Sequence, residues 1–141
     1  MTLSSPTLPD GYVRCDPGSG FSRELGEIFL DVARGRIAFV VTQKQCNPFG
    51  VCHGGAMATF ADAQVIAVRG DPTDADRHTP TINLSIDYLR PAPLGALVEA
   101  QVTLLRATGT VIFTQALIAV DDVLVARSSA VYRNSRKDPT S

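Results

Sequence analysis

The residues His53, Gly54 and Gly55 lie between a turn-rich segment and a long apolar stretch, and Asp62 follows nine residues after His53. A helix start offers unpaired backbone N–H groups and the positive end of the helix dipole, so it stabilises an anion or a developing oxyanion. A carboxylate within an apolar helix has to be paired, neutralised or used in chemistry. Together these residues predict a reaction centre.

The apolar stretch predicts one long helix over residues 54–69. Thr59, Asp62 and Gln64 are the polar residues that interrupt it before its basic end. A helix without a polar face does not lie on a protein surface, so a sheet must wrap around it or a partner must cover it.

Strand patterns precede and follow the helix. They are recognised by alternation of apolar and polar residues or by continuous apolar runs between turn signals. The predicted strands span residues 28–33, 37–41, 81–89, 98–106, 111–120 and 123–132. In the strand over 81–89 the alternation places Thr81 on the face opposite Leu84. One long buried helix and about six mostly antiparallel strands define an α+β domain.

The length of 141 residues is enough for one domain with a single core. Residues 1–20 are rich in Pro, Gly and Ser and are expected to be loosely ordered, and residues 134–141 form a polar tail. The domain itself is expected over residues 21–133, with a polar surface loop over 70–80.

Composition excludes several classes of function. A formal net charge of -1 gives no electrostatic reason to bind nucleic acid or a membrane surface. No segment reaches the roughly 18 to 20 apolar residues that span a bilayer, and the N-terminus lacks the pattern of a signal peptide. Three cysteines do not make a disulfide framework. We therefore expect a cytoplasmic protein.

A family resemblance follows from the motif N-x-x-G-x-x-H-G-G with an Asp nine residues after the His. It is carried here by Asn47, Gly50, His53, Gly54, Gly55 and Asp62. Residues 83–92 contain a Tyr-x-x-Pro turn at the end of a predicted strand. The chain resembles the hotdog-fold acyl-CoA thioesterases of the phenylacetate-pathway type over about residues 21–133. Cys52 is a modest departure, since an aliphatic residue is more usual there. The resemblance implies an antiparallel sheet wrapped around one central helix.

Hydrolysis of a thioester needs an activated water, a stabilised oxyanion and a fixed carbonyl. The Gly54 N–H is expected to form the oxyanion hole, and Asp62 to act as general base or as nucleophile. The resemblance implies that Asn47 helps to position water or carbonyl, that His53 orders the loop, and that Thr81 holds the water. No metal and no bound cofactor are expected.

Gly55 and Arg90 are assigned to binding of an acyl-CoA or aryl-CoA substrate. Arg90 is one of several basic residues that can meet the phosphates of coenzyme A, for each of which a solvated surface position is the alternative. The others are Arg69, Arg133, Arg136 and Lys137. The pocket wall is expected to include Ala58, Phe60 and Ala63.

Helix geometry predicts a homo-oligomer with sites shared between chains. Gly54 and Asp62 are eight residues apart, hence about 12 Å apart along one helix. A base must come within about 3 Å of its water, so the two residues do not easily serve one carbonyl from one helix. Two antiparallel copies of the helix across a twofold axis would bring Asp62 of one chain to Gly54 of the other. A dimer and a dimer of dimers both satisfy this geometry.

Structural alternatives remain for the individual residues. Asp62 can be a buried acid bonded to Thr59, His53 can be a proton carrier or a loop residue, and Asn47 can be a turn residue. Gly54 with Gly55 can be a tight turn, and Thr81 an ordinary strand residue.

A zinc site at Cys46, Cys52 and His53 is rejected, because the remaining candidate ligands, Cys15 and His78, lie in distant segments. Cys52 next to His53 is rejected as a nucleophile–base pair, because adjacent side chains point apart. The rival functions are a hotdog hydratase or dehydratase acting on acyl thioesters and a non-catalytic acyl-CoA-binding or sensor domain.

Overall fold

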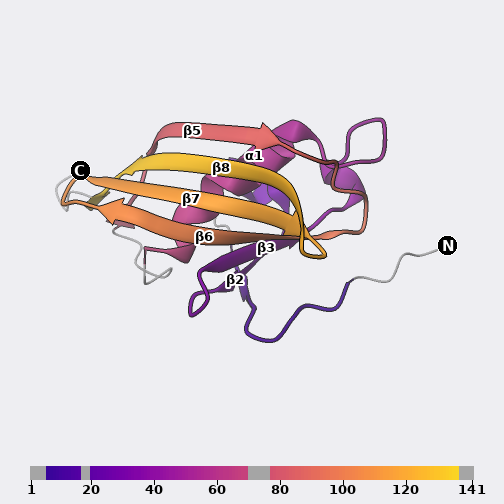
Figure 1. Ribbon diagram of the computed structural model, residues 1–141, viewed down its shortest axis with the longest axis horizontal. Helices are drawn as coiled ribbons and strands as arrows, with labels where there is room; N and C mark the ends of the chain where they lie inside the picture. Colours follow the sequence, from indigo (N-terminus) through magenta and orange to yellow (C-terminus); the bar gives the residue numbers. More distant parts are fainter. Residues whose placement is uncertain (1–5, 17–19, 70–76, 137–141) are drawn as a thin grey trace.

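A computed structural model describes residues 6–16, 20–69 and 77–136. Seven antiparallel strands form one sheet in the order β1-β2-β3-β6-β7-β8-β5. The strands are β1 (Val13–Cys15), β2 (Ile28–Asp31), β3 (Arg36–Val40), β5 (Thr81–Tyr88), β6 (Leu97–Ala107), β7 (Val111–Val120) and β8 (Val123–Arg133). The helix α1 (Gly54–Asp62) lies against one face of this sheet, behind β5 and β8 in the view of Figure 1. The predicted α+β hotdog architecture is confirmed.

The helical segment is shorter in its α part than predicted. After Asp62 the chain tightens into a 3-10 helix, η3 (Ala63–Ala67). The buried Gln64 side chain donates from Nε2 to the Ala61 carbonyl at 2.9 Å, and this is the carbonyl that a regular α-helix would offer to the Val65 N–H. A side chain inserted into the helix ladder is a common cause of such a change in winding.

Gln64 also fixes the helix to the sheet. Its Nε2 donates to Ser128 Oγ at 3.0 Å, and its Oε1 accepts from Thr114 Oγ1 at 2.7 Å. All three side chains are buried. A buried polar group costs little when it is hydrogen-bonded, so this network holds η3, which directly follows α1, on β7 and β8 at a small cost in desolvation.

The apolar contact between helix and sheet comes from Met57, Phe60 and Ala61. Phe60 is fully buried and packs against Phe39 of β3, with 4.6 Å between the ring centroids. Such tilted aromatic pairs stabilise the fold beyond the effect of the area that they bury.

Among the described residues, no helix has the length and apolarity needed to cross a bilayer.

The ends of the chain take more part in the fold than expected. The strand β1 lies within residues 1–20, which were expected to be loosely ordered. It pairs with β2 and adds a strand at the edge of the sheet. Two further strands, β4 (Arg77–His78) and β9 (Ser135–Arg136), pair with each other inside the predicted loop and tail. The rest of those segments, residues 70–76 and 137–141, lies outside the described residues. Strands of two or three residues are too short for alternation to reveal them. Two short 3-10 helices, η1 (Phe21–Leu25) and η2 (Gln43–Gln45), also precede α1.

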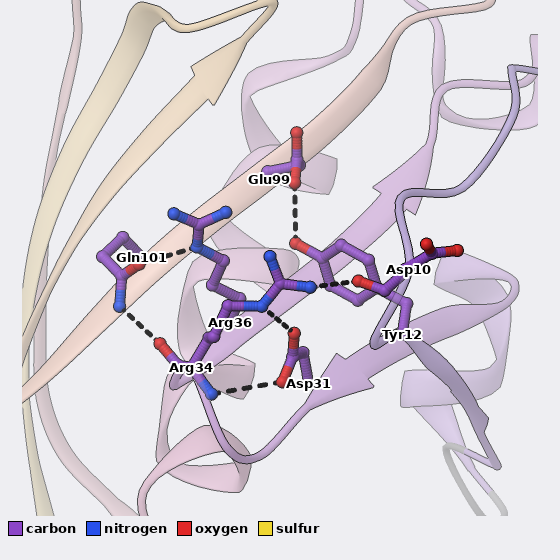
Figure 2. Close-up of polar contacts among 7 residues, drawn as sticks. All are labelled: Asp10, Tyr12, Asp31, Arg34, Arg36, Glu99 and Gln101. Atoms are coloured by element: carbon purple, nitrogen blue, oxygen red, sulfur yellow. Dashed lines mark hydrogen bonds and ion pairs between the residues drawn. The ribbon is translucent and has the colours of Figure 1, made fainter.

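A polar cluster holds the N-terminal segment on the sheet (Figure 2). The Arg34 guanidinium donates to the buried Asp31 carboxylate at 2.5 Å and to the main-chain oxygen of Asp10. The Tyr12 hydroxyl donates to Glu99 Oε2 of β6 at 2.8 Å. These contacts join the residues before β1 to the β2–β3 turn and to β6.

Asp31 makes the stability of this cluster depend on pH. Burial by itself raises the pKa of Asp31, but hydrogen bonds from the Arg34 N–H and guanidinium, with the charge of Arg34, hold that pKa below its usual range. A carboxyl with a lowered pKa in the folded state contributes stability above its unfolded pKa of about 3.9. That contribution is lost as the pH falls through the lower, folded value.

We predict that Asp31→Asn lowers the free energy of unfolding at pH 7 and that its difference from the wild type shrinks as the pH falls below about 4. Urea unfolding followed by circular dichroism at a series of pH values measures this difference. The matched control is Asp87→Asn, which breaks an exposed ion pair with Arg127 and should have a small effect throughout. A deficit in Asp31→Asn that stays constant into acid would contradict the prediction.

Candidate active site

Asp62 is the last residue of α1, is half-buried and lines a cavity of about 500 Å³. Its Oδ1 accepts a hydrogen bond from Thr81 Oγ1 at 2.7 Å. The structure therefore brings together two of the predicted site residues that are separated by 19 positions. The alternative partner, Thr59, instead donates to the main-chain oxygen of Gly55 at 2.9 Å. The interpretation of Asp62 as an acid bonded to Thr59 is wrong.

A β-bulge turns Thr81 toward the helix. In the pairing of β5 with β8, Thr81 lies opposite Tyr132 and Asn83 lies opposite Val131, so Ile82 is the extra residue. Residues directly opposite each other in an antiparallel pair share a face of the sheet. Thr81 therefore shares the helix-facing side with the buried Tyr132. The expectation that Thr81 faces away from this side is wrong, because strict alternation fails across a bulge.

Tyr132 is a site residue that the sequence did not reveal. Its hydroxyl donates to the main-chain oxygen of Asp62 at 2.7 Å, and its side chain is buried in the core. Burial, and then the negative charge of Asp62, raise the pKa of this tyrosine above its ordinary value. Two hydroxyls on neighbouring strands, Thr81 and Tyr132, thus contact the side chain and the main chain of Asp62.

At the other end of α1, His53 caps the helix. Its Nδ1 accepts from the Gly55 N–H at 2.8 Å, which satisfies one of the free donors of the first turn. A Cβ atom on Gly55 would lie 3.1 Å from that Nδ1, so glycine allows this close cap. In this contact His53 acts as a cap of α1.

Gly54 begins α1, and its N–H has no hydrogen-bond partner among the residues that the structure describes. Its carbonyl accepts from the Tyr88 hydroxyl at 2.6 Å. A cavity of about 400 Å³ lies beside it, with Tyr88 and Arg90 in its wall. Arg90 also donates from Nη1 to the main-chain oxygen of Leu124 at 2.8 Å. The unused Gly54 N–H has the character required of an oxyanion donor.

Asn47 shapes the loop that leads to the helix. Its Oδ1 accepts from the Phe49 N–H at 2.9 Å, a turn in which the side chain mimics the backbone. Within the described part of the chain, Asn47 makes no hydrogen bond with Asp62 or Thr81. The structure brings Thr81 to Asp62 and leaves Asn47 with the loop at the opposite end of α1.

One face of α1, with Gly55, Thr59 and Asp62, is exposed or half-buried along the whole helix. A third cavity of about 350 Å³ is lined by His53, Gly55 and Thr59, and it shares Phe21, Leu25 and Thr59 with the Asp62 cavity. Ala58 and Ala63 line the Asp62 cavity as expected. The expectation for Phe60 is wrong, because its ring is used in the core.

Phe21 was not recognised in the sequence as a pocket residue. It is 74% exposed and lines both cavities on this face, so it is the aromatic wall of the site. It belongs to a five-residue 3-10 helix between glycines, which has no periodic pattern to identify it.

Gly54 and Asp62 are the first and last residues of the nine-residue α1. At a rise of about 1.5 Å per residue they lie about 12 Å apart along the axis. A single chain therefore presents the carboxylate and the free amide at separate places.

Among residues 6–16, 20–69 and 77–136, no three His, Cys, Asp or Glu side chains gather as metal ligands would.

Comparison with known proteins identifies the class. A family model described as the thioesterase superfamily matches residues 49–127, which contain all of α1 and Thr81. This match covers more than half of the sequence, so the chain belongs to the thioesterase superfamily. The resemblance drawn from the motif is confirmed at the level of the superfamily.

Individual relatives agree with this assignment. The 1,4-dihydroxy-2-naphthoyl-CoA thioesterase 2 of Arabidopsis thaliana is 38% identical over 79 residues, which are 55% of this chain and 50% of the plant protein. The chain thus matches half the length of that relative. The E. coli PaaI protein from the phenylacetic acid degradation operon superposes with a TM-score of 0.58 at 20% identity, covering 70% of this chain and 73% of PaaI.

A hypothetical thioesterase protein from Streptococcus pneumoniae, solved with coenzyme A, superposes with a TM-score of 0.62. It is 18% identical, and the match covers 73% of this chain and 80% of that protein. At this level of identity both superpositions show a shared fold.

We predict that Tyr132→Phe lowers the free energy of unfolding by about 1 kcal/mol, because it removes one buried hydrogen bond to the end of α1 and little volume. Tyr88→Phe is the matched variant at the start of the helix. Tyr88 is exposed, so water can replace its hydroxyl, and the expected loss is smaller. Urea unfolding compares the two. Equal losses would show that burial of the Tyr132 bond has no energetic weight.

Proposed function

We propose that this protein is a thioesterase that hydrolyses acyl-CoA or aryl-CoA thioesters. The observation that carries the proposal is the hydrogen-bonded pair of Asp62 and Thr81 in the wall of a cavity with an otherwise largely apolar lining. The Thr81 hydroxyl occupies Oδ1 of the carboxylate, which leaves Oδ2 to face a water or a substrate carbonyl. A non-catalytic binding domain would have no need for a carboxylate held in this way.

In the base mechanism, Asp62 takes a proton from water while the water oxygen adds to the thioester carbonyl carbon. The carbonyl oxygen becomes an oxyanion, which accepts a hydrogen bond from the Gly54 N–H. Collapse of this intermediate breaks the carbon–sulfur bond, and the proton passes from Asp62 to the departing thiolate. In the nucleophile mechanism, Asp62 itself attacks and water hydrolyses the resulting anhydride.

We further propose that the amide and the carboxylate of one site come from two chains. Two features support a twofold dimer besides the 12 Å separation along α1. The helix face with Thr59 and Asp62 is only half-buried and lines an open cavity, and β5 is an edge strand with one side unpaired among the described residues. Antiparallel packing of two copies of α1 would cover this face and bring Asp62 to the partner's Gly54.

The proposed substrate class is inferred from the residues that line the Asp62 cavity and the cavity beside Gly54. Phe21, Leu25 and Ile28 give the Asp62 cavity an apolar surface that accepts an acyl chain or an aromatic ring. Arg90 lies beside Gly54, where a cation can meet a phosphate of coenzyme A. The plant relative is named for an aryl-CoA substrate, and the streptococcal relative was solved with coenzyme A. Both names support a coenzyme A thioester.

We predict that Asp62→Asn lowers kcat by about 10² to 10⁴ and leaves KM nearly unchanged, because it removes the base and keeps the shape. Thr81→Val should lower kcat less, since it frees the carboxylate without removing it. Release of coenzyme A thiol from short-chain, long-chain and aryl-CoA thioesters measures the rates.

Asp87→Asn serves as the control, because it alters an exposed carboxylate on the same strand as Thr81. Turnover near the wild-type rate in a folded Asp62→Asn variant would exclude Asp62 from the chemistry. Single turnover in ¹⁸O-labelled water identifies the nucleophile mechanism when labelled oxygen enters the Asp62 side chain, which happens when water attacks the Asp62 carbonyl carbon of the anhydride.

We predict that two inactive variants restore each other's activity when their subunits are exchanged. Gly54→Pro removes the proposed oxyanion donor, and proline is tolerated at the first helical position. His53 already has the extended conformation (φ −62°, ψ 137°) that a residue before proline adopts. Gly54→Ala is the matched control, because it adds a side chain and keeps the N–H.

When Gly54→Pro and Asp62→Asn are mixed, about half of the dimers become mixed, and each mixed dimer has one intact site of two. About a quarter of the wild-type activity should therefore return. Thiol release before and after exchange gives the activity, and mass spectrometry on tagged chains confirms the exchange. Mixed dimers without recovered activity would place Gly54 and Asp62 of one site on the same chain.

A further inference from the structure

Cys46 and Cys52 lie directly opposite each other across the turn that precedes α1. They form an isolated antiparallel bridge. The flanking hydrogen bonds run from the Asn47 N–H to the Val51 oxygen at 2.8 Å and from the His53 N–H to the Gln45 oxygen at 2.7 Å. Because these bonds lie on either side of the two cysteines, the cysteines are a non-hydrogen-bonded pair.

In such a pair the Cα atoms lie about 4.5 Å apart and both side chains leave the same face of the ladder. Disulfides span Cα separations of about 4.4 to 6.8 Å. The backbone therefore already holds Cys46 and Cys52 at a spacing that a disulfide accepts.

The surroundings of the two thiols agree with this placement. Both cysteines are half-buried and pack against the same apolar core cluster. Burial, and then the proximity of Cys46, raise the pKa of the Cys52 thiol to about 11. All three cysteines are free thiols in the structure.

We propose that Cys46 and Cys52 are an oxidisable dithiol site, which a small-molecule disulfide such as oxidised glutathione converts into an intramolecular disulfide. The proposal does not rest on the thioesterase reaction, although Cys46 lines the 350 Å³ cavity beside His53 and Cys52 lines the 400 Å³ cavity beside Gly54. It closes the turn over residues 47–51, which leads directly to His53 and Gly54.

The reaction balances in two exchange steps. The Cys46 thiol loses its proton and attacks the oxidant, which forms a mixed disulfide and releases one glutathione thiol. Cys52 then loses its proton and attacks the Cys46 sulfur, which forms the Cys46–Cys52 bond and releases the second glutathione thiol. Two electrons pass from the protein to the oxidant. We place the first attack on Cys46, because the raised pKa of Cys52 keeps that thiol protonated at neutral pH.

The Cys46–Cys52 disulfide should stabilise the fold. A bond between Cys46 and Cys52 restricts the unfolded chain, and the loop that it closes is short, so the gain is at the lower end of the usual range. We expect Tm to rise by roughly 5 °C and to return to its starting value on reduction with dithiothreitol.

The test treats the folded protein with oxidised glutathione, quenches it in acid, alkylates the remaining thiols and maps the products by mass spectrometry. The expected product has lost two hydrogen atoms, contains one Cys46–Cys52 peptide and carries an alkylated Cys15. Cys15→Ser is the matched control and should give the same disulfide and the same rise in Tm. Cys52→Ser should yield a glutathione adduct on Cys46 in place of the internal bond, whereas Cys46→Ser should react much more slowly, because the raised pKa of Cys52 keeps that thiol protonated.

The wild-type protein alone decides the question if the serine variants fail to fold. Glutathione adducts that persist on the wild-type Cys46, a disulfide that includes Cys15, or thiols that stay unreacted would each overturn the proposal. A Cys46–Cys52 disulfide that lowers Tm would overturn the stabilising role assigned to this bond.

Discussion

The two ends of α1 are held by tyrosine hydroxyls from the strands that flank it. Tyr88 of β5 donates to the carbonyl of Gly54, and Tyr132 of β8 donates to the carbonyl of Asp62. The buried Gln64 network then fixes the turn that follows. A helix of nine residues has little stability of its own, because most helical stability in proteins comes from tertiary packing. The positions of the carboxylate and of the free amide thus depend on the sheet.

The same arrangement explains why one chain is incomplete as a thioesterase of the proposed kind. The amide of Gly54 and the carboxylate of Asp62 lie at opposite ends of α1. Hydrogen bonds from Tyr88 and Tyr132 hold both ends of the helix in place, so neither end can move toward the other. In the proposed dimer, a second copy supplies the missing group at each end. The uncovered face of α1 and the open edge of β5 lie where such a copy would dock.

Sequence patterns predicted the elements that are long and regular. The strands over residues 81–88, 97–107, 111–120 and 123–133 agree with the alternation or apolar runs within a few residues. The carboxylate was found because Asp62 stands out in an apolar helix. Its contacts were not predictable in the same way. Thr81 reaches Asp62 through a bulge that breaks the alternation, and Tyr132 is 70 residues away from it in the sequence.

The aromatic wall of the pocket is carried by a segment outside the catalytic framework. Phe21 belongs to η1, which lies between Gly20 and Gly26, both with positive φ (82° and 95°). The short helix is attached to its surroundings by an ion pair of Glu24 with Lys44 and by a hydrogen bond from Gln45 to Leu25. Leu25 belongs to the hydrophobic core with residues of α1, whereas Phe21 is exposed and can change without altering α1, β5 or β8. Under the proposed function, a substitution of Phe21 would reshape the wall of the Asp62 cavity and leave the hydrogen bond between Thr81 and Asp62 as it is.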